Sequence, residues 1–324
     1  MRLHKFFAFF ILVVLLAFSF LAISDIFSKR IVLNKIAFIK KGESTTDIAQ
    51  KLEEEGIIKS AATFLLLEKI IPGTNPKYGK YRFNGRYNYP EVLKKINGSD
   101  VVSSMVTIPE GYTNRKIAAL FARKDLADFY TFDSLTTDST FISSLGLPVG
   151  NLEGFLFPDT YEIPYYADEK FIIRKMVDNF RLNISHLNKD KIKFDSLYST
   201  LILASIVERE AAWDKERDLI AGVYTNRLQR NMLLQADPTV AYALELNNQS
   251  RKKIYYKDLK IQSKYNTYIY RGLPPTPICN PGLQSILAAF EPRETNYLFF
   301  FAGDDSRHIF SKTYWEHLKK LNRI

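Results

Sequence analysis

Two glutamates near the end of an apolar stretch are the residues in this sequence best suited to acid–base chemistry. Residues 201–213 read LILASIVEREAAW, and Glu208, Arg209 and Glu210 interrupt an otherwise apolar run. If the stretch is a helix, residues three, four and seven positions apart share a face. Glu208 then lies beside small apolar residues such as Ala204, where a poorly solvated carboxyl could stay protonated near neutral pH. Such a group can donate a proton to a leaving oxygen.

Helical spacing does not choose between the two carboxyls. Glu210 also shares a face with apolar residues, among them Leu203 and Val207. Either glutamate could instead form a structural ion pair with Arg209 or Arg217, and such pairs perturb carboxyl chemistry as well. At this point a catalytic role and a structural role both stay open.

Polar side chains that could bind a sugar lie on both sides of this stretch. Residues 152–161, LEGFLFPDTY, mix carboxylates with aromatic rings, although such clusters also occur in ordinary protein cores. In residues 226–244, Asp237 and Pro238 indicate a tight turn. The proline-rich segment 265–281 would form a stiff loop suited to a binding cleft, or a structural connector. The candidate substrate-binding residues are Glu153, Asn226, Gln235, Asp237, Thr239 and Tyr268.

Composition excludes several classes of protein. The chain has 324 residues, enough for two modest domains, and 46% of them are hydrophobic. The net charge of +10 suits an anionic partner, but no Lys/Arg-rich block or nucleic-acid motif is present, so we expect no nucleic acid to bind. The single cysteine, Cys279, rules out an internal disulfide. The four histidines are widely scattered, so we expect no metal and no cofactor.

The N-terminus has the composition of a membrane anchor. Residues 6–23 read FFAFFILVVLLAFSFLAI, without charge, proline or glycine, and about 18 such residues can just span a bilayer. A cleaved signal peptide is the alternative, but the apolar core is long and no clear cleavage site follows. We therefore expect a cytoplasmic tail over residues 1–5 and a transmembrane helix over 6–24. The remainder would lie on the extracytoplasmic side of the cell membrane.

The rest of the chain predicts an α+β fold in two parts. Residues 31–105 indicate a small α+β module with strands near 31–39, 78–83 and 101–108 and helices near 46–55, 61–71 and 89–96. Ser44 or Thr45 and Ser60 can cap two of these helices. Residues 106–324 form a second, mixed α+β domain, with helices near 171–188, 219–228, 282–290 and 312–322 and strands near 296–302 and 309–310.

Several stretches, in order, resemble one family, the YceG-like endolytic murein transglycosylases. The matching segments are TIPEGY at 107–112, LEGFLFPDTY at 152–161, ASIVERE at 204–210, AGVYTNRLQRNMLLQADPTVAYAL at 221–244, YNTYIYRGLPPTPICNPG at 265–282 and HIFSKTYWEH at 308–317. The resemblance implies a single N-terminal transmembrane helix, a LysM-like module over 31–105 and a catalytic domain over 106–324. Two positions depart from the family pattern. Thr276 stands where the family usually has glycine, and the glycine-rich turn near the C-terminus reads GDDSR at residues 303–307.

The resemblance also implies a reaction. The family's catalytic glutamate, in its ASIVE motif, falls on Glu208, and Glu210 takes a supporting position. The expected reaction cleaves the β-1,4 bond between N-acetylmuramic acid and N-acetylglucosamine inside nascent glycan strands. It leaves 1,6-anhydro ends and terminates strand elongation. The implied partners are peptidoglycan, the membrane and the cell-wall synthases.

Two other functions fit the same residues. A lysozyme-like hydrolase needs a second carboxylate, about 5–5.5 Å from the first when retaining and about 6.5–9.5 Å when inverting. Asp237 or Glu153 would supply it. Alternatively, the protein could be a non-catalytic scaffold that binds glycan through the module at 31–105.

Overall fold

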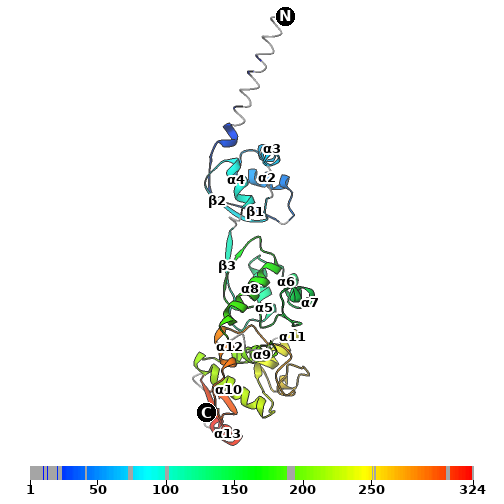
Figure 1. Ribbon diagram of the computed structural model, residues 1–324, viewed down its shortest axis with the longest axis vertical. Helices are drawn as coiled ribbons and strands as arrows, with labels where there is room; N and C mark the ends of the chain where they lie inside the picture. Colours follow the sequence, from blue (N-terminus) through cyan, green and yellow to red (C-terminus); the bar gives the residue numbers. More distant parts are fainter. Residues whose placement is uncertain are drawn as a thin grey trace. The chain divides into compact units, whose positions relative to one another are not determined.

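A computed structural model shows the chain as two compact units (Figure 1). The first unit comprises Met1–Met105 and Glu162–Ala167, and the second comprises Val106–Tyr161 and Asp168–Ile324. The structure describes residues 10, 13, 20, 24–40, 42–71, 76–98, 102–187, 194–249, 251, 253–303 and 307–322.

The expected transmembrane segment, residues 6–24, falls almost entirely outside the described residues. Within the described part of the chain, no helix combines the length and the apolar character needed to cross a bilayer. The membrane anchor therefore stays a prediction from the sequence.

The first unit is built on a two-stranded antiparallel sheet. Strand β1 (Arg30–Ile39) pairs with β2 (Gly79–Tyr87), with an irregularity in register between Val32 and Lys35. Its helices are α2 (Thr45–Glu54), α3 (Ala61–Ile70) and α4 (Tyr89–Asn97). Because alternate residues of a strand point to opposite faces, one side of this sheet meets the helices and the other does not.

The helix starts in the first unit follow local sequence signals. The side chains of Ser44 and Ser60 accept backbone N–H bonds at the first turns of α2 and α3, as predicted. Asn88 and Glu91 form a reciprocal capping box at the start of α4. Gly56 follows α2 with a φ of +70°, a conformation that glycine adopts without strain. These short-range interactions fix the helix boundaries to within a residue or two.

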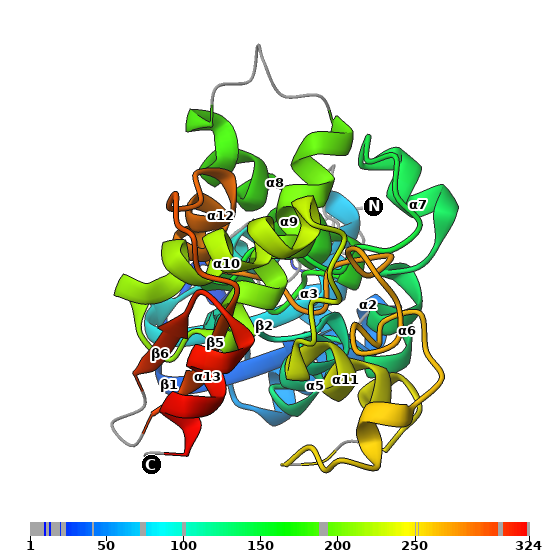
Figure 2. The same ribbon diagram turned by 90° about the horizontal axis from the view of Figure 1, so that it is seen from below.

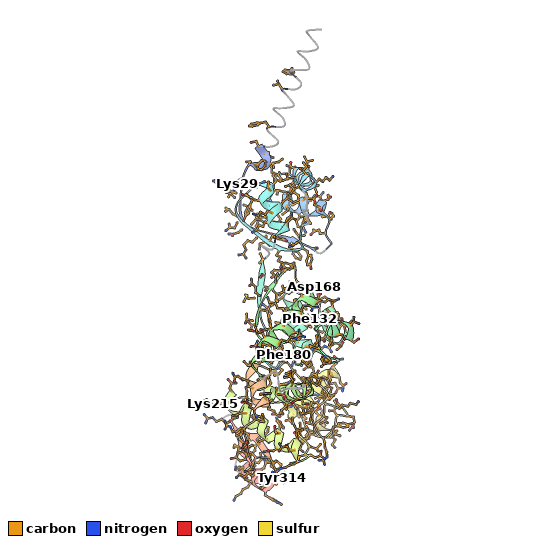
Figure 3. All side chains as sticks on the ribbon, in the orientation of Figure 1. Lys29, Phe132, Asp168, Phe180, Lys215 and Tyr314 are labelled. Carbon is orange, nitrogen blue, oxygen red and sulfur yellow. The ribbon has the colours of Figure 1, made fainter. Side chains whose placement is uncertain are left out.

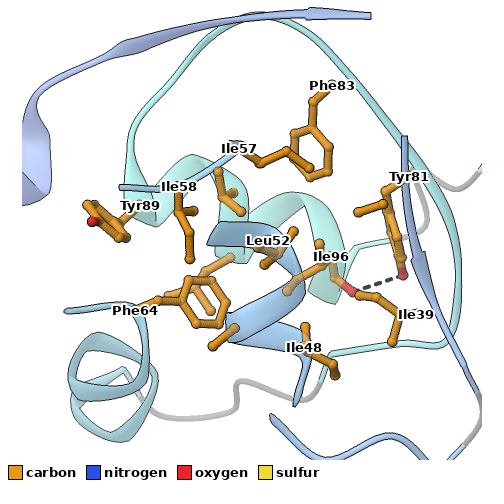
Figure 4. Packing of buried hydrophobic residues seen from close by; sticks show 14 of the residues in the cluster. Ile39, Ile48, Leu52, Ile57, Ile58, Phe64, Tyr81, Phe83, Tyr89 and Ile96 are labelled. Carbon is orange, nitrogen blue, oxygen red and sulfur yellow. Dashed lines mark hydrogen bonds between the residues drawn. The ribbon is translucent and has the colours of Figure 1, made fainter. Parts of the chain in front are cut away.

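The core of the first unit joins both strands to all three helices (Figure 4). Phe64, Tyr81, Phe83 and Ile96 are fully buried in it. The Tyr81 hydroxyl donates a hydrogen bond to the Ile96 carbonyl oxygen over 3.0 Å, so the one polar atom of this ring is satisfied inside the core. The first unit thus has a hydrophobic core of its own.

The second unit is organised around helix α9 (Phe194–Glu210), which contacts α10 (Arg217–Gln229), α11 (Asp237–Leu246) and α12 (Leu283–Phe290) (Figure 2). Residues 201–207 are all buried, so the helix is enclosed on every side there.

Helix α9 ends earlier than the predicted range of 201–213. It stops at Glu210, and Trp213 precedes a short 3₁₀ helix, η3 (Asp214–Glu216). Both glutamates therefore lie in the last turn of α9, where the helix dipole disfavours negative charge.

The second unit contains further helices and strands. They are α5 (Asn114–Arg123), α6 (Phe129–Leu135), α7 (Ser139–Ser144), α8 (Glu169–Asn183), strands β5 (Phe299–Ala302) and β6 (His308–Ser311), and α13 (Tyr314–Leu321). Strands β3 (Ser103–Thr107) and β4 (Thr160–Pro164) pair with each other. The Phe132 and Phe180 side chains, labelled in Figure 3, are buried within the second unit.

The α+β class is confirmed, with three separate two-stranded sheets among the described residues and no larger sheet there. The turn expected at Asp237-Pro238 is wrong, because these residues begin α11, with proline in its first turn. Proline suits that position, since the first turn of a helix needs no backbone N–H donor from it.

Candidate active site

The last turn of α9 sends its two carboxyl groups into different surroundings. Successive helix residues are about 100° apart, so Glu208 and Glu210 point about 200° away from each other. The two sites are therefore built from different neighbouring segments of the second unit.

Glu208 lies in a network of charged and polar groups. Its side chain is 6% exposed, and its Oε2 lies 3.3 Å from Nη1 of Arg217. The same oxygen accepts the backbone N–H of Gly282, the residue that precedes α12, over 3.0 Å. Arg217 also contacts Asp214 at 3.1 Å and the Ser285 hydroxyl at 2.5 Å. The structural ion pair that the sequence left open is therefore present, and it ties α9 to α10 and α12.

A third carboxylate, Glu110, joins this network from the TIPEGY segment. Its Oε2 lies 3.9 Å from Nη2 of Arg217. A Cβ placed on Gly282 would lie 1.9 Å from Glu110 Oε1, so the absence of a side chain there makes room for the carboxyl group. Burial, and then the neighbouring charge of Glu208, raise the pKa of Glu110. Glu110 is not among the residues predicted from the sequence, although its place in the TIPEGY motif was a usable signal.

Glu210 lies in a setting suited to a proton donor. Its Oε1 accepts a hydrogen bond from the Tyr224 hydroxyl over 2.7 Å. Desolvation, and to a smaller extent the charge of Asp237, raise the pKa of Glu210 from an ordinary 4.5 to about 7, against the lowering effect of the Tyr224 hydrogen bond. Near neutral pH a substantial fraction of this carboxyl is therefore protonated.

A pocket of about 360 Å³ opens beside Glu210. Three of the predicted substrate-binding residues, Gln235, Asp237 and Tyr268, line it together with Glu210. The Tyr268 hydroxyl donates to Asp237 Oδ1 over 2.6 Å. These residues come from the end of α9, the start of α11 and the proline-rich segment. The structure thus gathers half of the predicted binding residues around Glu210.

The pocket is also lined by aromatic residues from β5 and β6. The Phe300 ring packs edge to face with Tyr224 at 5.6 Å and with His308 at 5.2 Å. His308 Nδ1 lies 2.8 Å from a carboxylate oxygen of Glu216, which also accepts the His308 backbone N–H. Glu216 therefore fixes the orientation of the imidazole ring. His308 is not among the residues predicted from the sequence, although it begins the HIFSKTYWEH motif.

Two other predicted binding residues bond to the protein itself. The Asn226 side-chain amide donates to the carbonyl oxygens of Thr295 and Tyr297. Thr239 is fully buried, and its hydroxyl bonds the Ala236 carbonyl oxygen. Both side chains hold segments of the second unit together, and neither lines the pocket beside Glu210.

Glu153 lies in a separate place from Glu210. Its side chain is buried, and its Oε1 accepts the Asn114 backbone N–H at 2.9 Å and the Asn280 amide at 3.2 Å. The Tyr242 hydroxyl donates to its other oxygen at 3.1 Å. It borders a different cavity of about 500 Å³. Burial raises the pKa of Glu153 to about 8.

This buried carboxyl predicts a pH-dependent stability. Between the ordinary pKa of 4.5 and about 8, the folded chain keeps the Glu153 proton and the unfolded chain loses it. The free energy of unfolding should therefore fall as pH rises through this window, by up to about 1.4 kcal/mol per pH unit.

The Glu153→Gln variant keeps an acceptor for Asn114 and removes the titration. Urea unfolding at pH 5 and pH 8 should show the variant gaining stability relative to the parent chain as pH rises. Glu210 also titrates in part of this range, but it is common to both proteins and its contribution cancels in the difference. Equal differences at the two pH values would contradict the assigned role of Glu153.

The described residues contain no group of three or more histidine, cysteine, aspartate or glutamate side chains that could hold a metal ion. The pocket beside Glu210 instead presents carboxyl, amide, phenol and aromatic groups. Such a combination can bind a polar, hydroxyl-rich ligand and protonate an oxygen within it.

The fold and the pocket define an α+β protein with a protonatable carboxyl at the end of its central helix. Residues 37–323 match the YceG-like family, and the chain belongs to that family. A protein of Bacillus subtilis (strain 168) named endolytic murein transglycosylase is 32% identical over 303 residues, which cover 87% of this chain and 82% of the relative. A relative of the same name from Streptococcus pneumoniae (strain D39) is 31% identical over 82% of this chain and 53% of its own length.

A solved structure has the same fold. The 2.6 Å crystal structure of a yceG-like protein from Listeria monocytogenes is similar to this chain with a TM-score of 0.61 and 34% sequence identity. The similarity covers 90% of this chain and all of the Listeria chain. The fold described above is therefore that of a known relative.

Proposed function

We propose that this protein is a peptidoglycan lytic transglycosylase. It cleaves the β-1,4 bond between N-acetylmuramic acid and N-acetylglucosamine within glycan strands and leaves 1,6-anhydro ends. Membership of the YceG-like family and relatives named endolytic murein transglycosylase support this function. The observation that carries it is the protonatable carboxyl of Glu210 in a polar and aromatic pocket.

Glu210 is the better acid/base of the two glutamates on geometric grounds. A general acid works best when its pKa lies near the operating pH, and the pKa of Glu210 is about 7. It lines a pocket of about 360 Å³ that a ligand can enter. Glu208 Oε2, by contrast, already contacts the Gly282 N–H and the Arg217 guanidinium. We therefore propose the acid/base role for Glu210 and a structural role for Glu208, although the resemblance to the family implies the acid/base role at Glu208.

The reaction needs only one carboxyl group. Glu210 gives its proton to the glycosidic oxygen as the bond from that oxygen to C1 of the muramic acid breaks. The resulting carboxylate then takes the proton of the muramic acid C6 hydroxyl, whose oxygen forms a new bond to C1. Glu210 ends the cycle protonated, and no water enters the product. The neighbouring Asp237–Tyr268 pair and Gln235 supply hydrogen-bonding groups to hold the sugar in place.

The end of the product distinguishes this reaction from its alternatives. The full chain would be incubated with uncrosslinked glycan strands and the fragments analysed by mass. Fragments lighter by one water at the muramic end are expected. Hydrated reducing ends would instead indicate a hydrolase, with Asp237 as the nearest candidate for its second carboxylate because it lines the same pocket. Glycan binding without cleavage would favour a scaffold.

The N-terminal segment supports a membrane location as a further part of the proposal. Residues 6–24 would form a single transmembrane anchor, with residues 1–5 in the cytoplasm and the second unit on the extracytoplasmic side. Anchoring raises the effective concentration of the active site near newly made strands and cell-wall synthases. Protease treatment of spheroplasts should digest the second unit while intact cells protect it. Complete extraction of the protein by alkaline carbonate would contradict the anchor.

A further inference from the structure

The sheet of the first unit has one face that carries exposed apolar side chains. Val32, Ala37 and Ile39 of β1 point into the core and are at most 2% exposed. The residues on either side of Val32 and of Ala37 point away from the core. Ile31, Leu33, Ile36 and Phe38 are 58%, 69%, 47% and 41% exposed. This is an unusual density of exposed apolar side chains for one short strand.

The neighbouring strand places cations beside these side chains. Ile31 pairs with Arg86, and Ile36 pairs with Arg82. Directly paired residues project on the same side of a sheet, so the Ile31 and Ile36 side chains share their side with Arg86 and Arg82. Both arginines are exposed. We call Ile31, Leu33, Ile36, Phe38, Arg82 and Arg86 the apolar–basic face.

The charge of this face has one sign. Strands β1 and β2, RIVLNKIAFI and GKYRFNGRY, contain five arginine or lysine residues and no aspartate or glutamate. Among the described residues, neither Arg82 nor Arg86 forms an ion pair. Apolar groups interspersed with unpaired cations are the composition of surfaces that lie at the interface of anionic bilayers.

The position of this face along the chain limits what it can meet. Strand β1 starts at Arg30, six positions after the end of the proposed anchor at residue 24. Even a fully extended chain of that length spans only about 20 Å. The start of the sheet would therefore lie within reach of the headgroup layer. This step rests on the membrane anchor put forward under Proposed function.

We propose that the apolar–basic face rests on the surface of the bilayer that holds the anchor and binds its anionic phospholipids. The apolar side chains enter the interface between headgroups and acyl chains, and Arg82 and Arg86 contact lipid phosphates. The contact restricts the orientation of the first unit relative to the membrane, which the short segment after the anchor would not do by itself.

A fluorescent label on the full chain in lipid nanodiscs tests this contact. The Leu33→Cys variant would carry an environment-sensitive dye on the face. Leu66→Cys, on α3 and 58% exposed, would serve as the matched control outside it. The native Cys279 is fully buried, and burial raises the pKa of its thiol, so it should not take up the dye. Discs would contain phosphatidylcholine alone or mixed with phosphatidylglycerol.

In anionic discs, the dye at position 33 should shift its emission to the blue and become several-fold less accessible to an aqueous quencher. The dye at position 66 should show neither change. Combining Arg82→Glu with Arg86→Glu should abolish the effect at position 33. Because both arginines are exposed, this variant should keep the thermal transition of the parent chain, which circular dichroism would check.

Three results would overturn the proposal in different ways. Equal quenching at positions 33 and 66 in anionic discs, with the protein incorporated, would contradict the lipid contact but would be consistent with the anchor. Protection at position 33 that required added glycan strands instead of anionic lipid would reassign the face to glycan. Failure of the chain to incorporate into discs would remove the anchor and, with it, the basis for this contact. None of these results bears on the cleavage reaction.

Discussion

Replacement of Glu210 by glutamine should reduce kcat for glycan cleavage by at least about 100-fold, because the variant has no proton to donate to the leaving oxygen. Glutamine keeps the size of the side chain and can still accept the Tyr224 hydrogen bond, so the pocket should keep its shape. Binding of glycan strands should change little. Release of 1,6-anhydro fragments, followed by mass, and binding by sedimentation with insoluble peptidoglycan would measure the two effects separately.

Glu208→Gln is the matched control, since it makes the same change two residues earlier on the same helix. We expect it to lower the melting temperature, because it leaves the buried Arg217 guanidinium without its Glu208 partner. Its kcat should fall much less than that of Glu210→Gln. A folded but inactive Glu208→Gln protein, together with an active Glu210→Gln protein, would return the acid/base role to Glu208.

The second large effect is expected at Asn280, a fully buried residue that joins three separate segments. Its Oδ1 accepts the backbone N–H groups of Gly154 and Leu156, and its amide donates to the Tyr112 carbonyl oxygen. The same amide donates to Glu153 Oε1. Asn280→Ala leaves the buried N–H groups of Gly154 and Leu156 without their acceptor, at about 1–3 kcal/mol each. It also removes one donor each from the Tyr112 carbonyl oxygen and from Glu153, which keep their bonds to the backbone N–H groups of Asn280 and Asn114. The free energy of unfolding should fall by about 3–5 kcal/mol in total.

Denaturant unfolding of the parent chain and the variant under the same conditions would measure this loss of free energy of unfolding. Asn183→Ala provides the control, because the bonds that the Asn183 amide makes with described residues stay within its own helix, to the carbonyl oxygen and side chain of Asn179. We expect that change to cost less than about 1 kcal/mol. A loss at Asn280 no larger than the loss at Asn183 would show that the network is not important for stability.

The packing of the segments joined by Asn280 also restricts which residues they can contain. Gly154 has a φ of +91°, and a Cβ there would lie 2.7 Å from the Pro277 side chain. Only glycine fits both the backbone conformation and the close approach of the proline-rich segment. The LEGFLFPDTY and proline-rich motifs are thus packed directly against each other beside α9.

Much of the fold follows from short-range signals in the sequence. Ser44, Ser60 and Asn88 fix the starts of helices α2, α3 and α4 through hydrogen bonds three residues away. The apolar run at residues 201–207 predicts a fully buried helix, because a helix that is apolar on all sides would expose apolar side chains to water anywhere else. These interactions are local, so the sequence alone contains them. The ordered motifs likewise identify the YceG-like family without any coordinates.

The sequence could not decide which of the two glutamates faces a ligand. Both lie on the same helix, both have apolar helical neighbours, and the motif alone selected Glu208. Their difference comes from residues outside helix α9: Arg217 and Gly282 beside Glu208, and Tyr224 and Tyr268 near Glu210.

The sequence by itself therefore determined the family, the buried central helix and the presence of an acidic pair at its end. Only the tertiary structure decided that α9 stops at Glu210 and that the pocket opens on that side. The physical reason is that desolvation depends on everything packed around a carboxyl group. The segments that surround Glu210 come from α10, α11 and β5–β6, and their positions depend on how the whole second unit folds.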